Sequence, residues 1–404
     1  MTVQQFLVIG ALVTLAGGAL ELAIRRAVAS ARRSFQWIVT EDDDLPELDQ
    51  ERLATFLTAS FSPTLGWEPV PGSSGEDRAP GSLTRYSIDT EGARSAPEGV
   101  PEPTVAVFGD SYAFCRQVDD DRTWAAVLGR RAGIGVLNLG VGNYGVDQAL
   151  LRYLERRRRL PEGVGTVLAV FVPETVCRVQ SVWKHWMEFG NTFGFKPRFV
   201  LGSEGLELHP SPVRSADDFV RIERAVERAA ELDPFLHRRF RRIQFRTSYL
   251  WSSLRAPLRH AVILTTVLTG RTADGELRQS AFDRAFAQVM RSNVREAHRA
   301  YRDADQTALL TAILERFRDE VEADGRRFIA CVVPQLLDLA RPQRADRTYR
   351  AYFANLAARM EVVDVTDDLL AGERSAMYVH DRYGGHLSVG GNEVVAERLA
   401  KVLG

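Results

Sequence analysis

The stretch VAVFGDSYAF, residues 105–114, decides the fold class of this chain of 404 residues. Its first half is apolar and rich in β-branched residues, as in a strand that is buried on both faces of a sheet. Asp110 and Ser111 follow directly. A serine at the end of a buried strand, next to a glycine, is well placed as a nucleophile, with backbone N–H groups nearby for an oxyanion. Asp and Ser after a strand are also common helix caps, so both interpretations remain open here.

Four later runs are also short, apolar and rich in β-branched residues, and helix-like segments separate them. The runs are GVLNLG (135–140), TVLAVFV (166–172), RFIACVV (327–333) and EVVDV (361–365). Alternation of buried strands with helices predicts an α/β doubly wound sheet. Functional sites in such folds lie at the carboxyl ends of the strands.

Residues from about 178 to 305 interrupt the alternation between the third and fourth strands. This stretch is long for a loop, so we expect a helical subdomain or cap. It contains the basic run HRRFRRIQFR (237–246) and the apolar run AVILTTVL (261–268). The basic run is typical either of a segment that lies on an anionic membrane surface or of a solvent-exposed helix.

The N-terminal part differs from the rest. FLVIGALVTLAGGALELAI, residues 6–24, holds 19 residues with Glu21 as its one charge. About 20 apolar residues span a bilayer as a helix, so residues 1–25 are expected to form a single-pass anchor. A signal-peptide core and a buried helix are the alternatives, although no Lys or Arg precedes Arg25, as a signal peptide would normally require. Residues 26–100, rich in Pro, Gly, Ser and acidic residues, are expected to be a linker or lead-in to a domain at 101–404.

The composition is that of an ordinary globular protein and excludes a disordered or fibrous chain. Lys plus Arg number 52 and Asp plus Glu 53, for a formal net charge of -1. Without a basic excess, nucleic-acid binding over the whole surface is not expected. Three scattered cysteines without a CxxC pair indicate neither a disulfide scaffold nor a zinc site.

Two further motifs complete the candidate chemistry. HDRYGGHLSVGGNEVVAERL, residues 380–399, places His386 in a Gly-rich loop before an amphipathic helix, with Asp381 five residues upstream. A serine nucleophile needs such a base and an acid that orients it, although a loop histidine without a role is the common alternative. VLNLGVGNYGVDQ, residues 136–148, follows the second strand with a polar loop suited to an oxyanion. It matches neither a P-loop nor a dinucleotide-binding pattern.

Taken in this order, the three motifs resemble the SGNH/GDSL hydrolase family from Val105 to the C-terminus, apart from the insertion. The lead-in, with LGWEPVPG (65–72) and RYSIDTEGAR (85–94), is similar to that of membrane-anchored members. The resemblance implies a three-layer α/β/α sandwich with a parallel five-stranded, flavodoxin-like sheet and a helical insertion. It also implies hydrolysis or transfer of acyl esters, with Ser111 as nucleophile, His386 as base and Asp381 as the nearest candidate acid.

The chain departs from the family pattern at three points. The usual acid position, three residues before the histidine, holds Tyr383. The usual oxyanion glycine is replaced by Asn143, with Gly142 before it. After the third strand the usual Asn is absent, and Glu174 and Thr175 stand there. Thr175, Asn143 or Asn191 are the alternative donors, and Glu174 is a candidate second acid or base, a ligand for a sugar hydroxyl, or a plain helix-terminal carboxylate. Loss of one oxyanion donor typically costs ~100- to 1000-fold in rate.

These observations lead to two hypotheses. The first is a membrane-anchored serine esterase or O-acyltransferase that acts on an acyl ester, with a carbohydrate ester as the favoured substrate class, and needs no metal or organic cofactor. The second is a non-catalytic binding or assembly module of a cell-envelope complex with the same fold. The resemblance implies a catalytic domain outside the cytoplasm, whereas Arg25, Arg26, Arg32 and Arg33 after the anchor favour the cytoplasmic side.

Overall fold

The computed structural model describes residues 2–79, 82–340, 347–379 and 385–404. Its centre is a parallel sheet in the order β11-β10-β7-β5-β6. The strands are β5 (Pro103–Gly109), β6 (Gly135–Asn138), β7 (Thr166–Phe171), β10 (Arg327–Val332) and β11 (Val362–Asp364). All five runs expected from the sequence therefore form strands of one sheet, and the α/β fold class is confirmed.

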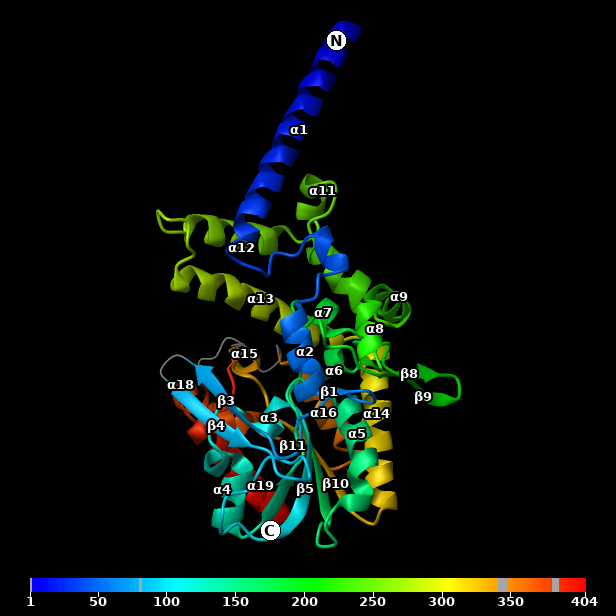
Figure 1. Cartoon of the computed structure of the whole chain (residues 1–404), viewed down its shortest axis with the longest axis vertical. Coiled ribbons are helices and arrows are strands. Elements are labelled where there is room, and N and C mark those ends of the chain that lie inside the picture. The colour runs from blue at the N-terminus through cyan, green and yellow to red at the C-terminus, as the bar shows by residue number, and fades with distance from the viewer. Residues whose placement is uncertain (1, 80–81, 341–346, 380–384) are drawn as a thin grey trace.

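Helices cover both faces of this sheet. Because side chains alternate along a strand, each central strand contributes to two cores. On β5, Ala106 and Phe108 face the core under α5 and α14, while Val105 and Val107 face the core under α4 and α19. The covering helices are α4 (Trp124–Ala132), α5 (Val146–Arg156), α14 (Ala304–Ala323) and α19 (Val389–Leu403). The result is the expected three-layer sandwich, visible in the lower half of the molecule (Figure 1).

The strand order determines where a site can form. β5, the first strand of the sheet in the chain, lies between β6 and β7, so the connections after β5 and β7 leave the sheet toward opposite faces. Ligands in doubly wound folds bind in the crevice that opens at such a switch point. Ser111 follows β5 and Glu174 follows β7, which places both at this crevice.

Residues 26–100 are folded onto the domain, rather than extended as a linker. They form α2 (Gln50–Ala59) and the antiparallel pairs β1 (Phe61–Ser62) with β2 (Gly66–Trp67) and β3 (Ser74–Ala79) with β4 (Ser82–Ser87). Arg94 joins this segment to β6, because its N–H donates to the Asn138 carbonyl at 2.8 Å. Buried polar contacts of this kind are invisible to composition, which is why the sequence suggested a linker.

The insertion between β7 and β10 is mostly helical, as expected, but it also holds a β-hairpin, β8 (Arg198–Gly202) with β9 (Gly205–His209). The capping box of Ser215 and Asp218 starts a helix, which breaks at Arg221 into two. The helices of this region are α6 (Thr175–Arg178), α7 (Lys184–Met187), α8 (Ala216–Val220), α9 (Ile222–Leu232), α10 (Arg241–Ile243), α11 (Tyr249–Ser253), α12 (Pro257–Thr269) and α13 (Gln279–Ala300). After β10 the chain adds α15 (Leu336–Leu339), α16 (Thr348–Leu356), α17 (Thr366–Ala371) and α18 (Arg374–Met377).

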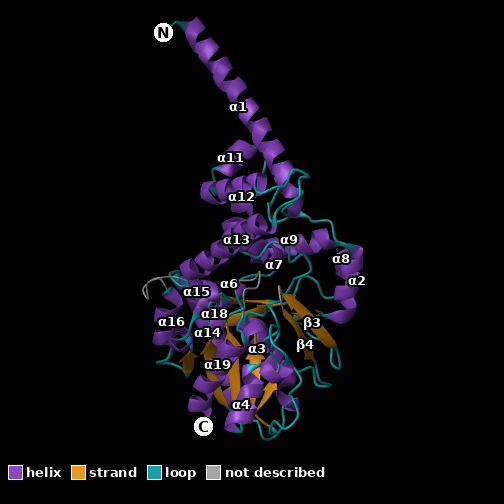
Figure 2. Ribbon diagram, turned by 90° about the vertical axis from the view of Figure 1, so that its left-hand side faces the viewer, coloured by secondary structure: helices purple, strands orange, loops and turns teal. Residues whose placement is uncertain are grey.

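The N-terminal helix α1 (Val3–Arg32) projects away from the body of the molecule in both views (Figures 1 and 2). Its length and apolar composition are sufficient to cross a membrane, by the same test that a signal sequence passes. Its last turns are different, because Val28 and Ala31 are buried. They pack in a separate apolar cluster with Ile263 of α12 and Phe286 of α13.

Candidate active site

The turn after β5 holds Ser111 at the carboxyl edge of the sheet. Gly109 is required there, since a Cβ on it would lie 1.8 Å from the carbonyl oxygen of Val170 on β7. Asp110 is the N-cap of the short helix α3 (Ser111–Phe114) and accepts the N–H of Tyr112 at 2.8 Å. The cap interpretation of this motif therefore applies to Asp110, and it leaves the Ser111 hydroxyl available.

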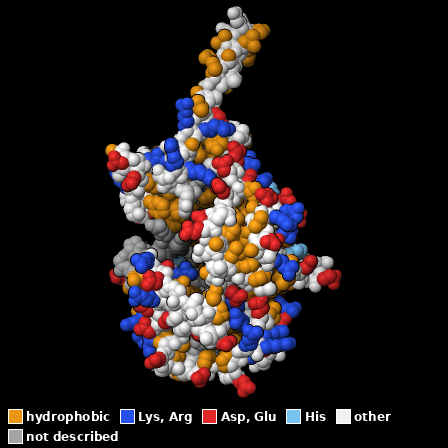
Figure 3. Space-filling model, viewed as in Figure 1, with side chains coloured by type: hydrophobic (Ala, Val, Ile, Leu, Met, Phe, Trp, Pro, Cys, Tyr) orange, Lys and Arg blue, Asp and Glu red, His pale blue; other side chains and the backbone are white. Residues whose placement is uncertain are grey.

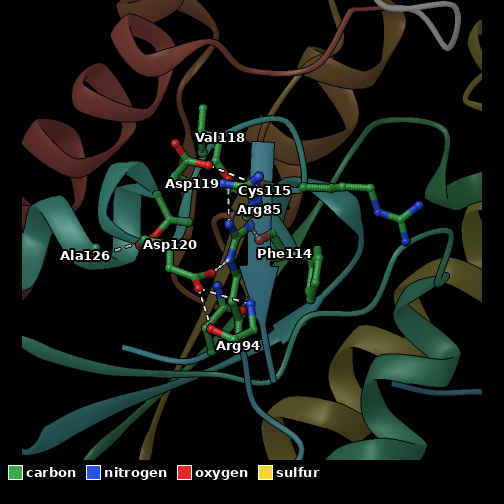
Figure 4. Close-up of polar contacts among 12 residues, drawn as sticks. Arg85, Arg94, Phe114, Cys115, Val118, Asp119, Asp120 and Ala126 are labelled. Carbon is green, nitrogen blue, oxygen red and sulfur yellow. Dashed lines mark hydrogen bonds and ion pairs between the residues drawn. The ribbon is translucent and has the colours of Figure 1, made fainter. Parts of the chain in front are cut away.

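The carbonyl groups at the end of α3 are held by side chains from two distant segments. The Asn138 amide donates to the Ala113 carbonyl at 2.7 Å. The buried Arg94 guanidinium donates to the carbonyls of Phe114 and Cys115, each at 2.5 Å. Arg94 also pairs with Asp120 at 2.8 Å and reaches the carbonyl of Val118 (Figure 4). These contacts make the nucleophile turn rigid, because every orphan carbonyl of a four-residue helix needs a partner.

His386 lies beside Ser111, as the sequence predicted for a base. The Nε2 atom of His386 is 3.0 Å from the Oγ atom of Ser111, a hydrogen-bond distance. The Tyr112 ring stacks on the imidazole, with centroids 5.0 Å apart and planes 26° apart. The Tyr112 hydroxyl donates to the Gly385 carbonyl at 2.6 Å and so ties the histidine loop to α3. Asp381, the candidate acid, lies outside the described residues.

The loop after β6 lies at the same place and carries the candidate oxyanion groups. Gly142 and Asn143 line the cleft together with Ser111 and His386. Among the residues that the structure describes, the backbone N–H groups of Ser111, Gly142 and Asn143 donate to no protein acceptor. Asn143 has φ +70°, and the Trp67 indole N–H donates to the Gly142 carbonyl at 2.9 Å. Trp67 therefore holds the turn of Gly142 and Asn143 at the cleft.

Glu174 and Thr175, which stand where the family resemblance implies an Asn, have different surroundings. Glu174 lines the cleft and forms an ion pair with Arg178 at 3.0 Å. The Thr175 hydroxyl is buried and accepts the N–H of Val146 at 3.0 Å. Asn191 also lines the cleft, where its amide donates to the carbonyl of Glu188 at 2.9 Å. Glu174 therefore lines the cleft, whereas Thr175 is not among its lining residues.

A buried row of charges underlies the cleft, and the sequence did not predict it. Arg178 bridges Glu174 to the fully buried Asp110, with an Arg178–Asp110 distance of 3.1 Å. Asp110 also accepts the N–H of Val172 at 2.9 Å, so its carboxylate joins β5 to the end of β7. The spacing of Glu174 and Arg178, four residues apart after a strand, was the available signal, since such pairs share one helix face.

Lys184 and Glu188 continue this row. Lys184 pairs with Glu188 at 3.3 Å and lies 3.4 Å from the Asn143 carbonyl. Burial lowers the pKa of Lys184, while the paired glutamate opposes that shift. Burial disfavours the Glu188 carboxylate, but Lys184 and Arg178 outweigh it and hold the pKa of Glu188 below its usual value. The Lys184–Glu188 ion pair therefore lies in the cleft next to the loop after β6.

The cleft has a volume of about 920 Å³ and is longer than the site itself. From Ser111 it runs along aromatic side chains, including Phe189 and Phe193, to Trp37 and Phe286 under the base of α1. Other aromatic side chains of residues 183–199 are instead buried in the core, namely Trp183, Trp186 and Phe195. Burial raises the pKa of the Cys115 thiol to about 12, so this neighbour of the nucleophile stays protonated.

The strand order gives the chain a flavodoxin-like, three-layer α/β/α fold, and Ser111 and His386 meet at one edge of its sheet. No protein-family model matches the sequence, and no curated protein matches it either.

Solved structures match the chain at low identity. One is a protein of the lipolytic G-D-S-L family from Desulfitobacterium hafniense DCB-2, with 11% identity, a TM-score of 0.34, and coverage of 74% of this chain and 99% of that chain. Another, from Lactobacillus plantarum, has 11% identity, a TM-score of 0.34, and coverage of 75% and 97%. An α/β hydrolase enzyme from the metagenome of Lake Arreo, Spain, has 10% identity, a TM-score of 0.31, and coverage of 75% and 95%. At these identities and TM-scores the matches assign no activity to this chain.

Proposed function

We propose that this protein is a membrane-anchored, serine-dependent acyl-ester hydrolase or O-acyltransferase. The observation that carries the proposal is the 3.0 Å contact between Ser111 Oγ and His386 Nε2, inside a cleft at the switch point of the sheet. Nucleophile and base within hydrogen-bond reach are the signature of nucleophilic acyl transfer.

In the proposed reaction Ser111 Oγ attacks the acyl carbonyl carbon while His386 Nε2 takes its proton. The C–O bond to the alcohol then breaks, and His386 returns the proton to the leaving oxygen. Water or an acceptor hydroxyl, deprotonated in turn by His386, attacks the acyl-serine carbonyl. The bond to Ser111 Oγ then breaks, and His386 returns the proton to that oxygen, which restores the free serine. Asp381 is proposed to orient His386.

The oxyanion is proposed to bind the backbone N–H groups of Ser111 and Gly142, with Asn143 as a further donor. Their freedom from protein acceptors supports this role. Glu174 is ion-paired, so we propose that it binds a substrate hydroxyl. The Thr175 side chain is fully buried and is not among the residues that line the cleft, which argues against Thr175 as a donor.

A carbohydrate ester is the proposed substrate class. The cleft combines aromatic faces, such as Trp67 and Phe193, with fixed charges, such as Glu174 and Lys184. Rings with interspersed polar groups suit sugars, which offer both apolar faces and hydroxyls.

A non-catalytic binding module is the second candidate. The observation that favours it is the carboxylate of Glu174 in place of an amide donor, because an ionised carboxylate donates no hydrogen bond to an oxyanion. The cleft would then bind an envelope component without cleaving it.

A serine-reactive fluorophosphonate probe separates the two. We expect labelling of the wild-type protein, none of Ser111→Ala, and slower labelling of His386→Ala. An exposed serine, as in Ser203→Ala, is the control and should label like wild type. No labelling of folded wild-type protein would contradict the enzyme and favour the binding module. Product analysis with and without a sugar acceptor then distinguishes transfer from hydrolysis.

Helix α1 is proposed to be an uncleaved anchor, with the catalytic domain outside the cytoplasm. Contacts of its last turns support retention, since Arg32 pairs with the buried Asp43 at 2.6 Å. Topology reporters fused after Gly404 test the orientation: activity of a reporter that works only outside the cytoplasm is expected, and activity of a cytoplasmic reporter would reverse it.

A further inference from the structure

The short helix α11 lies against the end of the apolar run of α1. Glu21, the one charge in that run, is the cap of α11: its carboxylate accepts the N–H groups of Tyr249 at 2.9 Å and Leu250 at 2.7 Å, and the Ser248 hydroxyl at 2.6 Å. Arg25 pairs with Glu21 at 2.8 Å, and its guanidinium lies 4.5 Å from the centre of the Tyr249 ring. α11 is thereby fixed at the level of Glu21 and Arg25.

This level corresponds to the edge of a bilayer if α1 crosses it. The 19 residues from Phe6 to Ile24 span about 28 Å as a helix, close to the ~30 Å hydrocarbon thickness. Glu21 lies three residues before the end of this run, about 4.5 Å inside it. Both views show α11 beside α1 and farther out along it than α12 (Figures 1 and 2).

From α11 to the start of α12 the protein exposes large apolar side chains. Trp251 on α11 is 68% exposed, Leu254 directly after α11 is 59% exposed, and Leu258 in the first turn of α12 is 65% exposed. The basic run 237–246, which the sequence suggested for membrane contact, is different, because its Phe240 and Phe245 are buried in the protein. The exposed apolar surface therefore lies just after that run.

Charge around this surface suits anionic lipid. Arg26, Arg33 and Arg255 are exposed, and Lys and Arg side chains gather around the base of α1 (Figure 3). Tryptophan is enriched at the boundary of headgroups and acyl chains, and basic residues near the surface are attracted to anionic lipid.

We propose that α11 and the first turn of α12 form a second membrane-contact element, in which Trp251, Leu254 and Leu258 enter the headgroup–acyl boundary of the bilayer that α1 crosses. The occupant is lipid because the surface is continuous with the helix that enters the same bilayer. The element gives the domain a fixed tilt and holds the far end of the cleft, at Trp37 and Phe286, near the membrane. The proposal rests on α1 as an anchor, and not on the chemistry of Ser111.

Site-directed fluorescence in the full-length protein tests it. The native Cys115, Cys177 and Cys331 are buried, so a single introduced cysteine is labelled selectively with the NBD fluorophore. The protein is reconstituted into vesicles of phosphatidylcholine and phosphatidylglycerol that carry a nitroxide either near the headgroup or deep in the acyl chain. Leu254→Cys reports on the proposed contact, and Leu12→Cys reports on α1. Val220→Cys is the matched control, because Val220 is apolar, 79% exposed and on α8.

We expect the emission of NBD at position 254 to be blue-shifted in the vesicles and quenched by the shallow nitroxide. The deep nitroxide should quench NBD at position 12. Neither nitroxide should quench NBD at position 220. Equal, unquenched emission at positions 254 and 220 would overturn the proposal. A blue shift at 254 without lipid quenching would also overturn it, by indicating a protein partner or a second copy. No quenching at position 12 would overturn it together with the anchor. Fluorophosphonate labelling of the same samples reports the Ser111 chemistry separately.

Discussion

At the scale of single residues, Tyr112 is the side chain that aligns the proposed base with the nucleophile. It stacks on His386 and its hydroxyl donates to Gly385 at 2.6 Å. Tyr112→Phe keeps the ring and removes this bond, which is worth about 0.5–1.5 kcal/mol. If the bond is needed for alignment, kcat should fall roughly 2- to 10-fold with KM nearly unchanged. Steady-state kinetics on a fluorogenic ester measures this.

Tyr352→Phe is the matched control for that substitution. The Tyr352 hydroxyl contacts Thr311 at 2.8 Å, away from the cleft, so kcat should stay at the wild-type value. A wild-type kcat for Tyr112→Phe, or an equal loss in both variants, would contradict the positioning role of Tyr112.

His185 makes stability depend on pH. It is buried between Trp183 and Phe240, lies 3.1 Å from the Asp43 carbonyl, and burial lowers its pKa to about 4. In the unfolded chain the histidine pKa is ~6.5, so the unfolded chain binds the proton more readily than the folded one. The contribution of neutral His185 to the free energy of unfolding is therefore complete above about pH 6.5 and is lost as the pH falls toward 4. The expected loss is about 3 kcal/mol over this window. Urea unfolding at several pH values measures it.

The comparison variants for this prediction are His185→Gln and His237→Gln. The first should reduce the pH dependence between 6.5 and 4, because one of the two buried histidines with lowered pKa values, His185 and His260, is gone. His237 is exposed, so the second should leave the dependence unchanged. An unaltered slope in His185→Gln would show that other groups cause it.

Two residues of the candidate site could be identified from the sequence. Ser111 and His386 were identified because each stands in a distinctive local motif, and they meet as expected. The Asp110–Arg178 pair was missed, because its members are far apart in sequence and each has an ordinary local role. Asp381 stays a prediction, as it lies outside the described residues.

At the scale of elements, the approach of β5 to β7 depends on Gly109. A Cβ at that position would lie 1.8 Å from the Val170 carbonyl oxygen, and this backbone atom cannot move without breaking the sheet. Gly109→Ala is therefore expected to destabilise the protein by about 3 kcal/mol or more. Chemical denaturation followed by circular dichroism measures the free energy of unfolding.

Gly165→Ala serves as the control for Gly109→Ala. Gly165 directly precedes β7, and no atom lies within 4 Å of its hypothetical Cβ. Its substitution should change the free energy of unfolding by less than about 0.5 kcal/mol. Equal effects of the two substitutions would show that the close approach of the strands is not what requires Gly109.

Strands were the elements most readable from the sequence. Short, β-branched runs that are apolar throughout have few alternatives to a buried parallel strand. The lead-in is more ordered than its composition suggests, because its order comes from single long-range contacts, such as those of Arg94 with the Phe114 carbonyl and of Trp67 with the Gly142 carbonyl. Such contacts cannot be predicted from the local composition of the segment.

At the scale of the whole molecule, α1 has two parts with different roles. Residues 2–16 are exposed throughout, whereas Val28 and Ala31 are buried and Arg32 pairs with Asp43. Deletion of residues 2–20 should therefore release the protein from membranes and leave its thermal midpoint unchanged. Deletion of residues 2–32 should lower the free energy of unfolding by about 3 kcal/mol or more.

Vesicle flotation and thermal unfolding of both truncated proteins check this prediction. Fluorophosphonate labelling of the shorter deletion shows whether the site stays intact. Equal stability of the two deletions would mean that the last turns of α1 are not part of the fold, and continued flotation of the first would mean that another element suffices for membrane binding.

The sequence by itself determined the parallel sheet, the apolar N-terminal helix and the positions of Ser111 and His386, because hydrophobic periodicity and local motifs act over a few residues. Only the tertiary structure decided that the lead-in is part of the domain, that Arg178 joins Asp110 to Glu174 under the cleft, and that Glu21 fixes α11 beside α1. These features depend on which distant groups share a buried space, where each polar group must find a partner.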